Sequence, residues 1–313
     1  MKIAFVGKGG SGKTTLAALV ARSLVARQFP VLAIDADINQ HLAYALSGDH
    51  SIKLPPLGIK IDRIKEYVRG NNPRIMSAKE MIKTTPPGEG SRLMRLNEKN
   101  PVYDYFVKEV GGVRLMVAGE FTKEDLGVKC YHSKTGAVEL FLNHLIDKPK
   151  EYIVVDMTAG ADSFASGLFT RFDATFVVVE PTLKSVSVFE QYMNHAKDFS
   201  VSVFAVGNKI ADDDDLRFLE QKVGKQLIAT FGYSHYVRAM EKGEFLPLET
   251  LEPKNNKALI DIVATTDKSL KNWKKFYAQA VEFHKRNAES WGNEAVGKNL
   301  LTQVDPNFVF PES

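Results

Sequence analysis

The sequence has very little cysteine and no long run of apolar residues. Its 313 residues include one cysteine, Cys130, which excludes an internal disulfide bond and any site built from several cysteines of one chain. No apolar run approaches the roughly 20 residues that span a bilayer, and glycines interrupt the opening residues too soon for a signal peptide. We therefore expect a cytoplasmic protein.

The net charge is also small. A formal charge of +3 is too low to indicate nucleic-acid binding by itself. With 44% hydrophobic and 25% charged residues, the composition excludes disordered and collagen-like chains. The charge is uneven, because residues 51–110 carry 12 lysines and arginines against 7 aspartates and glutamates, which makes this segment +5 and the remainder −2. Clusters of proline and glycine surround short amphipathic pieces there, which predicts a basic helical insertion at about residues 51–110.

Outside that segment, short apolar runs rich in β-branched residues alternate with stretches of helical periodicity. Nearly continuous apolar strands separated by helices indicate a parallel sheet that is covered on both faces. We therefore predict an α/β protein of three layers, with a mostly parallel sheet of about seven or eight strands. The runs that we expect to be strands are residues 2–6, 30–34, 113–118, 152–156, 174–179 and 202–206.

A glycine-rich motif follows the first of these runs and precedes an apolar helical stretch at residues 16–25. It satisfies the pattern G-x-x-x-x-G-K-[ST] in the strand, loop and helix setting of a phosphate-binding P-loop. Backbone N–H groups of the loop and the helix N-terminus would surround phosphate oxygens. Lys13 would neutralise the β and γ phosphates, and the Thr14 hydroxyl would bind Mg²⁺. The residues expected to bind the nucleotide here are Gly9, Gly10, Ser11, Gly12, Lys13, Thr14 and Thr15.

Lys8 is a second lysine that a simple P-loop does not need. The pattern K-G-G-x-G-K-T-T resembles the deviant Walker A ATPases, a group that includes MinD, ParA and the nitrogenase iron protein. The resemblance implies a P-loop NTPase fold and a homodimer that sandwiches ATP between two chains. It also implies that Lys8 reaches the nucleotide of the other subunit; otherwise Lys8 is a solvated lysine without a catalytic part.

Two aspartates, Asp35 and Asp37, follow the second expected strand. Carboxylates at the carboxyl end of a strand beside a P-loop face the γ-phosphate, where water and Mg²⁺ are held. The family pattern implies that Asp37 positions or activates the attacking water, and Asp35 would support the loop and the water shell of the metal. An alternative, compatible with these roles, is that Asp37 or Asn39 caps the next helix.

A second acidic strand end is expected at Asp156, which ends an apolar run and precedes Gly160. A carboxylate there can bind the water shell of Mg²⁺, and Gly160 lets the backbone approach the γ-phosphate and move when it leaves. The resemblance identifies these residues as the Walker B aspartate and switch II.

Asn208 and Lys209, which end another apolar run, suggest which nucleotide base the site accepts. GTPases would have N-K-x-D here, but the fourth position is Ala211, so we expect ATP. In the family, Asn208 would hydrogen-bond to adenine and Lys209 would pack its aliphatic stem beside the base.

The runs at residues 118–121, 127–132, 137–142, 155–160 and 179–181, taken together, resemble the CooC-type ATPases, which help insert nickel into carbon monoxide dehydrogenase. In that subgroup a C-x-C pair from each of two subunits binds a divalent metal, and the matching triplet here is Cys130, Tyr131 and His132. Two copies of Cys130 and His132 across a two-fold axis would supply thiolate and imidazole ligands for Ni²⁺ or Zn²⁺. A purely structural cysteine beside an exposed histidine is the alternative.

The C-terminal part is expected to lie outside the ATPase domain of residues 1–266 and to form a helix and an extended tail over residues 267–313. An apolar stripe runs through it, flanked by Lys271 and other basic residues, and we expect it to pack on its own domain or on a partner subunit. A helix on a membrane surface is the alternative. The stripe comprises Leu270, Trp273, Phe276, Tyr277, Ala280, Val281 and His284.

The sequence thus predicts a dimeric Mg²⁺-ATPase with Lys8, Lys13 and Asp37 as catalytic residues and Thr14, Asp35 and Asp156 around the magnesium. The favoured function is maturation of, or metal insertion into, a client enzyme. The alternatives are a positioning protein like MinD or ParA that binds membrane or DNA as an ATP dimer, and an assembly subunit in which nucleotide controls a partner interface.

Overall fold

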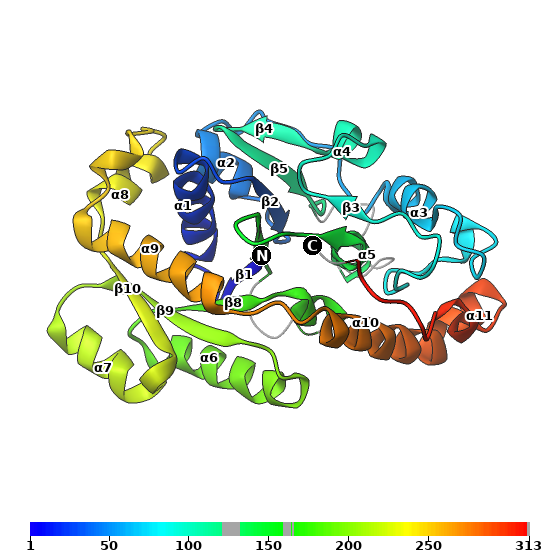
Figure 1. The fold of residues 1–313 in the computed structure, drawn as a ribbon. Coiled ribbons are helices and arrows are strands. Elements are labelled where there is room, and N and C mark those ends of the chain that lie inside the picture. Colours follow the sequence, from blue (N-terminus) through cyan, green and yellow to red (C-terminus); the bar gives the residue numbers. More distant parts are fainter. Residues whose placement is uncertain (121–131, 159–163, 165, 312–313) are drawn as a thin grey trace.

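A mostly parallel sheet of eight strands forms the centre of the chain (Figure 1). The computed structural model describes residues 1–120, 132–158, 164 and 166–311. The strand order is β10-β9-β8-β1-β7-β2-β5-β4, and only the edge pair of β4 and β5 is antiparallel in it. The strands are β1 (Lys2–Gly7), β2 (Val31–Ala36), β4 (Lys108–Val110), β5 (Val113–Val117), β7 (Tyr152–Met157), β8 (Ala174–Val179), β9 (Val203–Ile210) and β10 (Leu227–Gly232).

The predicted α/β class and parallel sheet are confirmed. All six expected strands are present with small shifts of their ends, the largest being β9, which continues to Ile210. The edge strands β4 and β10 were not expected, since β4 lies inside the segment taken for an insertion and β10 is only partly buried. A two-stranded pair of β3 (Met94–Arg95) and β6 (Leu145–Ile146) lies outside the main sheet.

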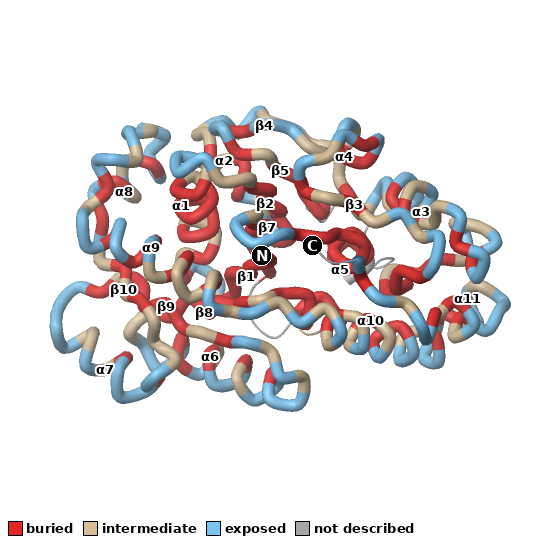
Figure 2. The backbone as a smooth tube through the Cα atoms, in the orientation of Figure 1, coloured by how far each residue is buried: buried red, intermediate tan, exposed pale blue. Residues whose placement is uncertain are grey.

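Helices cover both faces of the sheet, which gives three layers (Figures 1 and 2). Alternate residues of β1 point to opposite faces, so that Ala4 and Val6 join one core and Ile3 and Phe5 join the other. One face is covered by α1 (Lys13–Ala26), α2 (Leu42–Ser47), α8 (His235–Glu241) and α9 (Pro253–Lys268), and the other by α5 (His132–Asn143), α6 (Leu183–Ala196) and α7 (Asp213–Val223).

The basic segment of residues 51–110 is only partly helical. It contains α3 (Ile61–Arg69) and α4 (Pro101–Phe106), joined by turns. Buried side chains of both helices, including Ile64, Val68 and Phe106, belong to the same core as α5. The segment is therefore packed onto the main domain. Among the residues that the structure describes, no helix is both long and apolar enough to span a membrane.

The C-terminal helix α10 (Trp273–Asn287) packs its apolar stripe against its own chain. Phe276, Ala280 and His284 are buried, as expected for a stripe that packs on its own domain. Leu270 was wrongly included in the stripe, because the helix begins only after Asn272, whose side chain caps it, and Leu270 is 91% exposed. After α11 (Asn293–Val296) the tail folds back, so the ring of Phe310 lies 4.6 Å from that of Trp273.

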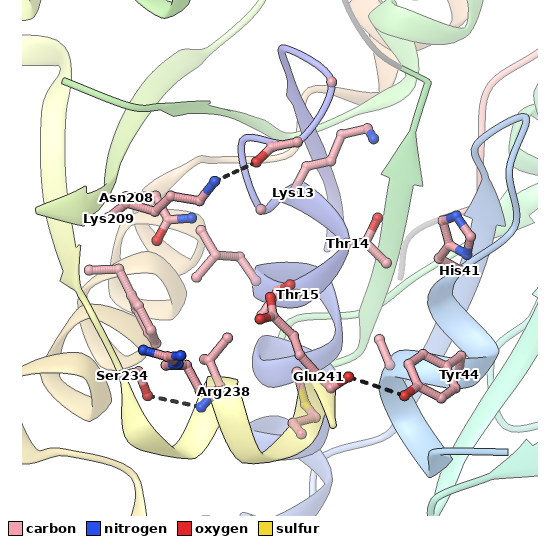
Figure 3. A pocket seen from close by; sticks show the side chains of 18 of the residues that line it. Lys13, Thr14, Thr15, His41, Tyr44, Asn208, Lys209, Ser234, Arg238 and Glu241 are labelled. Atoms are coloured by element: carbon pink, nitrogen blue, oxygen red, sulfur yellow. Dashed lines mark hydrogen bonds between the residues drawn. The ribbon is translucent and has the colours of Figure 1, made fainter. Parts of the chain in front are cut away.

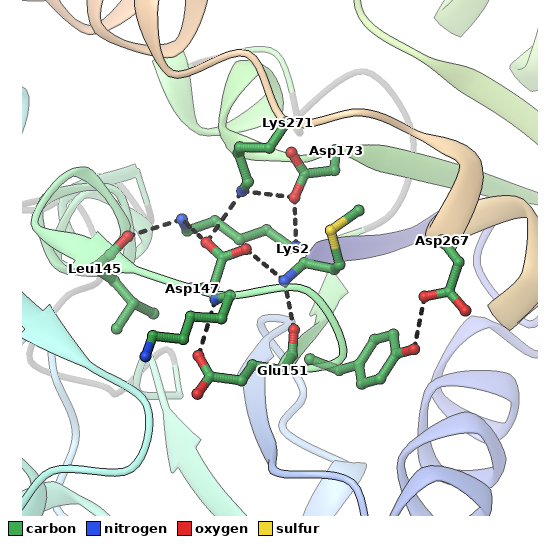
Figure 4. A network of polar contacts seen from close by, with 10 residues as sticks. Lys2, Leu145, Asp147, Glu151, Asp173, Asp267 and Lys271 are labelled. Atoms are coloured by element: carbon green, nitrogen blue, oxygen red, sulfur yellow. Dashed lines mark hydrogen bonds and ion pairs between the residues drawn. The ribbon is translucent and has the colours of Figure 1, made fainter. Parts of the chain in front are cut away.

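A buried cluster of charges joins this helix to the amino ends of the strands (Figure 4). The ammonium groups of Lys2 and Lys271 lie 2.5 Å and 3.0 Å from the carboxylate of Asp147, and Lys271 also lies 2.6 Å from Asp173. Burial lowers the pKa of Lys2 to about 8 even though Asp147 opposes the shift. Lys271 was one of the basic residues expected to flank the stripe. Its side chain is only 13% exposed and forms ion pairs within the fold, which does not fit the alternative of a helix on a membrane surface.

Truncation of Phe276 to alanine is expected to lower the free energy of unfolding by about 3–5 kcal/mol, because the ring is buried and its loss leaves a cavity. The guanidinium of Arg171 lies 4.3 Å from this ring and would lose its contact. Denaturant unfolding followed by circular dichroism measures the change. Leu270→Ala is the matched control and should change stability by less than about 0.5 kcal/mol because Leu270 is exposed. Equal effects of the two substitutions would contradict the observed docking.

Candidate nucleotide site

The P-loop lies between the carboxyl end of β1 and the first residue of α1, as predicted. Gly10 and Gly12 have φ angles of +79° and +96°, a conformation that favours glycine. A Cβ atom on Gly12 would lie 2.2 Å from Asn208 Nδ2, so a larger residue would clash. Gly12 is also the N-cap residue of α1 and offers no side-chain cap. The first N–H groups of α1 are therefore directed toward an anion site.

Lys13 lies among carboxylates that come from three different strand ends or loops. Its ammonium group lies 2.5 Å from Asp37 Oδ2, and the side chain is nearly buried. Burial alone would lower the pKa of Lys13, but the carboxylates of Asp156 and Asp37 outweigh it and hold the pKa above its ordinary value. The structure thus brings Lys13 and Asp37 into direct contact in one site, and a phosphate would have to replace Asp37 as the partner of Lys13.

Thr14 and Asp156 form the second contact of the site. The Thr14 hydroxyl donates a hydrogen bond of 2.6 Å to Asp156 Oδ2, while Oδ1 of Asp156 is buried and has no hydrogen-bond partner in the described part of the chain. Burial and the neighbouring Asp35 raise the pKa of Asp156 well above its usual range. A hydroxyl beside an unpaired carboxylate oxygen is an oxygen donor set of the kind that Mg²⁺ prefers, so these residues fit the metal.

Asp35 uses both carboxylate oxygens to hold the loop after β2. Oδ1 accepts a hydrogen bond of 3.1 Å from the Asp37 N–H, and Oδ2 accepts one of 2.8 Å from the Leu42 N–H. Burial raises the pKa of Asp35 to about 7. The alternative that Asp37 or Asn39 caps the next helix is wrong, because the N-cap residue of α2 is His41 and Asp37 Oδ1 accepts from the Asn39 N–H inside the loop.

Asn208 and Lys209 contact the P-loop backbone. Asn208 Nδ2 donates a hydrogen bond of 2.6 Å to the Ser11 carbonyl, and the Lys209 ammonium donates one of 2.8 Å to the Gly10 carbonyl. Lys209 also lies 2.7 Å from Glu180, whose other oxygen lies 3.1 Å from Lys8. The predicted residues thus meet at one edge of the sheet, with their side chains bound to one another.

A pocket of about 900 Å³ opens beside these residues (Figure 3). One wall is formed by the loop after β2 and by α2, and the opposite wall is formed by the end of β10 and by α8. Sequence reasoning missed this second wall because β10 was not expected, although parallel strands that end at the same edge would have pointed to it. The lining residues that were missed include His41, Tyr44, His50, Phe231, Tyr233, Ser234, Val237, Arg238 and Glu241.

Three predicted residues cannot be placed in the site. Cys130 and Gly160 lie outside the described residues, and of His132 only the backbone position at the start of α5 is described. In the described ranges, no group of three or more His, Cys, Asp or Glu side chains is arranged to hold a metal ion.

The parallel sheet, the glycine loop at a helix N-terminus and the acidic strand ends together define a P-loop nucleotide-binding ATPase. More narrowly, residues 3–278 match the CobQ/CobB/MinD/ParA nucleotide binding domain, and the chain belongs to that family.

Two relatives cover most of the chain. An uncharacterised ATP-binding protein of Methanocaldococcus jannaschii is 29% identical over 249 residues, which are 79% of this chain and 89% of that protein. The carbon monoxide dehydrogenase accessory protein CooC of Rhodospirillum rubrum is 28% identical over 244 residues, which are 77% of this chain and 87% of CooC. The predicted resemblance to CooC is thus confirmed at the level of sequence.

Solved structures of the family share the fold. A ParA family ATPase from Chlorobium tepidum superposes with a TM-score of 0.53 at 17% identity and covers 90% of this chain and 98% of its own. A chain of the MinC:MinD cell division protein complex of Aquifex aeolicus superposes with a TM-score of 0.53 at 19% identity, and the match covers 87% of this chain and 97% of that one. These structures support the predicted three-layer fold.

Proposed function

We propose that this chain is a Mg²⁺-ATP-dependent dimeric switch that couples ATP binding and hydrolysis to the maturation of a partner enzyme. The observation that carries the ATPase part is the convergence of Lys13, Thr14, Asp37 and Asp156 at the uncapped N-terminus of α1. The sequence relationship to CooC, which extends along most of both chains, supports the maturation part.

Nucleotide binding would exchange protein contacts for phosphate contacts. The N–H groups of Gly9 to Thr15 would donate hydrogen bonds to phosphate oxygens, and Lys13 would leave Asp37 for the β and γ phosphates. Asn208 and Lys209 would contribute to the base side of the same pocket, which their strand end borders. The exchange keeps the Lys13 ammonium paired with an anion in both states, so ATP binding does not leave this nearly buried positive charge unpaired.

Thr14 and Asp156 would hold Mg²⁺, with Asp35 supporting the surrounding loop through its two backbone hydrogen bonds. When bound, the metal neutralises charge on the β and γ phosphates. A cation there would also favour the ionised forms of Asp35 and Asp156, whose pKa values burial now raises. The protein residues alone are too few to enclose the ion, which is typical of magnesium sites completed by phosphate and water.

Hydrolysis is phosphoryl transfer from ATP to water. Asp37, released from Lys13, would orient the water in line with the γ-phosphate and accept its proton as the bond to ADP breaks. Lys13 would stabilise the charge that develops on the transferred group, and Lys8 of the second subunit would add to it across a homodimer. The products are ADP and inorganic phosphate, so the chemistry needs no further reactant.

We further propose that the dimer binds a metal ion as cargo. The candidate ligands for Ni²⁺ or Zn²⁺ are Cys130 and His132 of both chains. Titration of the protein with either metal, in the presence of a non-hydrolysable ATP analogue, tests it. We expect one ion per dimer, lost in Cys130→Ser. Stoichiometric binding that survives this substitution, or no binding in the unmodified protein, would contradict metal handling and leave the ATPase proposal standing.

A MinD-like or ParA-like positioning function is the alternative. The buried stripe of α10 argues against a membrane-surface helix, because Phe276 and Ala280 are packed inside the protein and are not exposed to a membrane. Liposome sedimentation and salt-dependent DNA binding, each with and without ATP, test the alternative directly. Binding in either assay that requires ATP would favour positioning over maturation.

A further inference from the structure

Glu180 forms a bridge between two lysines at the edge of the P-loop. Its Oε2 atom lies 3.1 Å from the Lys8 ammonium, and its Oε1 atom lies 2.7 Å from the Lys209 ammonium. The Glu180 side chain is only 13% exposed, whereas Lys8 and Lys209 are 29% and 42% exposed. Each carboxylate oxygen thus has a lysine partner, and the carboxylate is the least exposed member of the three.

The backbone around Glu180 is fixed. Glu180 follows β8 directly, its N–H donates a hydrogen bond of 2.9 Å to Ser185 Oγ, and its carbonyl accepts one of 2.7 Å from the Thr182 N–H. Thr182 in turn caps α6. Glu180 therefore sits on a hydrogen-bonded turn, whereas Lys8 extends from the glycine-rich loop and is the more exposed partner.

Lys209 fixes the other side of the bridge. Its φ of +59° is unusual for a residue other than glycine, and its ammonium group also donates to the Gly10 carbonyl. Lys8 and Lys209 reach Glu180 from opposite sides, one from the loop after β1 and one from β9. The lysines hold the pKa of Glu180 below its usual range against the effect of its burial, so the carboxylate remains charged.

We propose that Glu180 is a positioning residue that holds Lys8 against its own subunit and thereby raises the protein concentration at which two nucleotide-bound chains associate. This inference rests on the proposed function, in which Lys8 reaches the nucleotide of the other subunit. Lys8 cannot contact Glu180 and a distant phosphate at once, so each subunit must break the Lys8–Glu180 pair before the dimer closes. Phosphate bound at the P-loop would promote that release, because its negative charge repels the nearby carboxylate.

The size of the expected effect on dimerisation follows from how exposed the Lys8–Glu180 ion pair is. A partly exposed ion pair of this kind changes an equilibrium by about threefold. Because a symmetric dimer breaks two such pairs, removing the carboxylate should strengthen association by about tenfold.

The test is Glu180→Gln in the full chain. Dimerisation is measured by sedimentation velocity at a series of protein concentrations in the presence of a non-hydrolysable ATP analogue. The expected result is that the dimer forms at about tenfold lower protein concentration than in the unmodified protein. Glu220→Gln is the matched control, because Glu220 is exposed on α7 and the substitution removes the same charge. Unchanged or weaker dimerisation of Glu180→Gln would overturn the proposal, and weaker dimerisation would show that Glu180 is itself needed in the dimer.

A second measurement addresses the monomer without nucleotide. Labelling of Lys8 by an amine-reactive reagent should be faster in Glu180→Gln than in the unmodified protein, and a purely structural Glu180 would leave that rate unchanged. If Glu180→Gln fails to fold, Glu180→Asp retains the charge but shortens the side chain, and it should shift both readouts in the same direction by less. Failure of the unmodified protein to dimerise with nucleotide would instead contradict the proposed function.

Discussion

Replacement of Lys13 by alanine is expected to lower the affinity for ATP by about a hundredfold or more, because a charged hydrogen bond to phosphate is lost in a nearly buried site. The substitution also leaves Asp35, Asp37 and Asp156 without the ammonium group that now offsets their charge. Three carboxylates would then face an incoming triphosphate of the same sign. Isothermal titration calorimetry with Mg²⁺-ATP measures the loss.

Two controls separate this effect from a general change in the protein. Lys222→Ala removes an exposed lysine from α7 and should leave ATP affinity unchanged. Lys13→Gln keeps a hydrogen-bond donor of similar length and should fold normally while still losing most of the affinity. Retention of the original affinity in Lys13→Ala would contradict the assignment of the P-loop as the phosphate site.

The nucleotide edge of the fold was predictable because its signals are local. The glycine loop, Lys13 and Thr14 are contiguous in sequence, and parallel strands bring their carboxyl ends to one edge wherever they lie in the chain. Asp37 and Asp156 could therefore be placed near Lys13 before their contacts were seen.

The partners of individual side chains were not predictable in the same way. Glu180 lies in one of the runs that resemble the CooC-type ATPases, but that run does not indicate its partners. Only the place of β8 between β9 and β1 brings Glu180 to Lys8 and Lys209. Similarly, the helical period at Leu270 is correct as a pattern, but capping by Asn272 starts the helix too late to include that residue. The periodicity of apolar residues predicts which face of a helix is buried. The position of the N-cap residue decides where the helix begins, and therefore which residues belong to that face.

The basic segment of residues 51–110 illustrates what a count of charges misses. The guanidinium of Arg63 lies 4.1 Å from the centre of the Tyr105 ring, and that of Arg92 lies 5.1 Å from the Tyr67 ring. Arg69 donates a hydrogen bond of 2.8 Å to the Ile75 carbonyl. Several of the positive charges of this segment therefore stabilise the segment itself, because arginine stems and guanidinium planes pack on aromatic rings.

Replacement of Asp37 by alanine is expected to reduce the rate of ATP hydrolysis by about 10²–10⁴-fold, because the group that orients and deprotonates water is removed. ATP binding should persist or tighten, since the substitution also frees Lys13 from an ion pair of 2.5 Å. The opposite response of binding and turnover distinguishes this variant from Lys13→Ala. Phosphate release under saturating ATP and titration of ATP binding measure the two quantities.

The same variant would trap the nucleotide-bound form, in which the dimer and any client are held together because hydrolysis no longer releases them. Pull-down with Asp37→Ala and ATP should retain partners that the unmodified protein loses, and metal analysis of the eluate would show whether cargo travels with them. Asp213→Ala is a suitable control because Asp213 is an exposed carboxylate of α7. Unchanged turnover in Asp37→Ala would refute its role, and the water would then have to be oriented by phosphate oxygens or by another residue at this edge of the sheet.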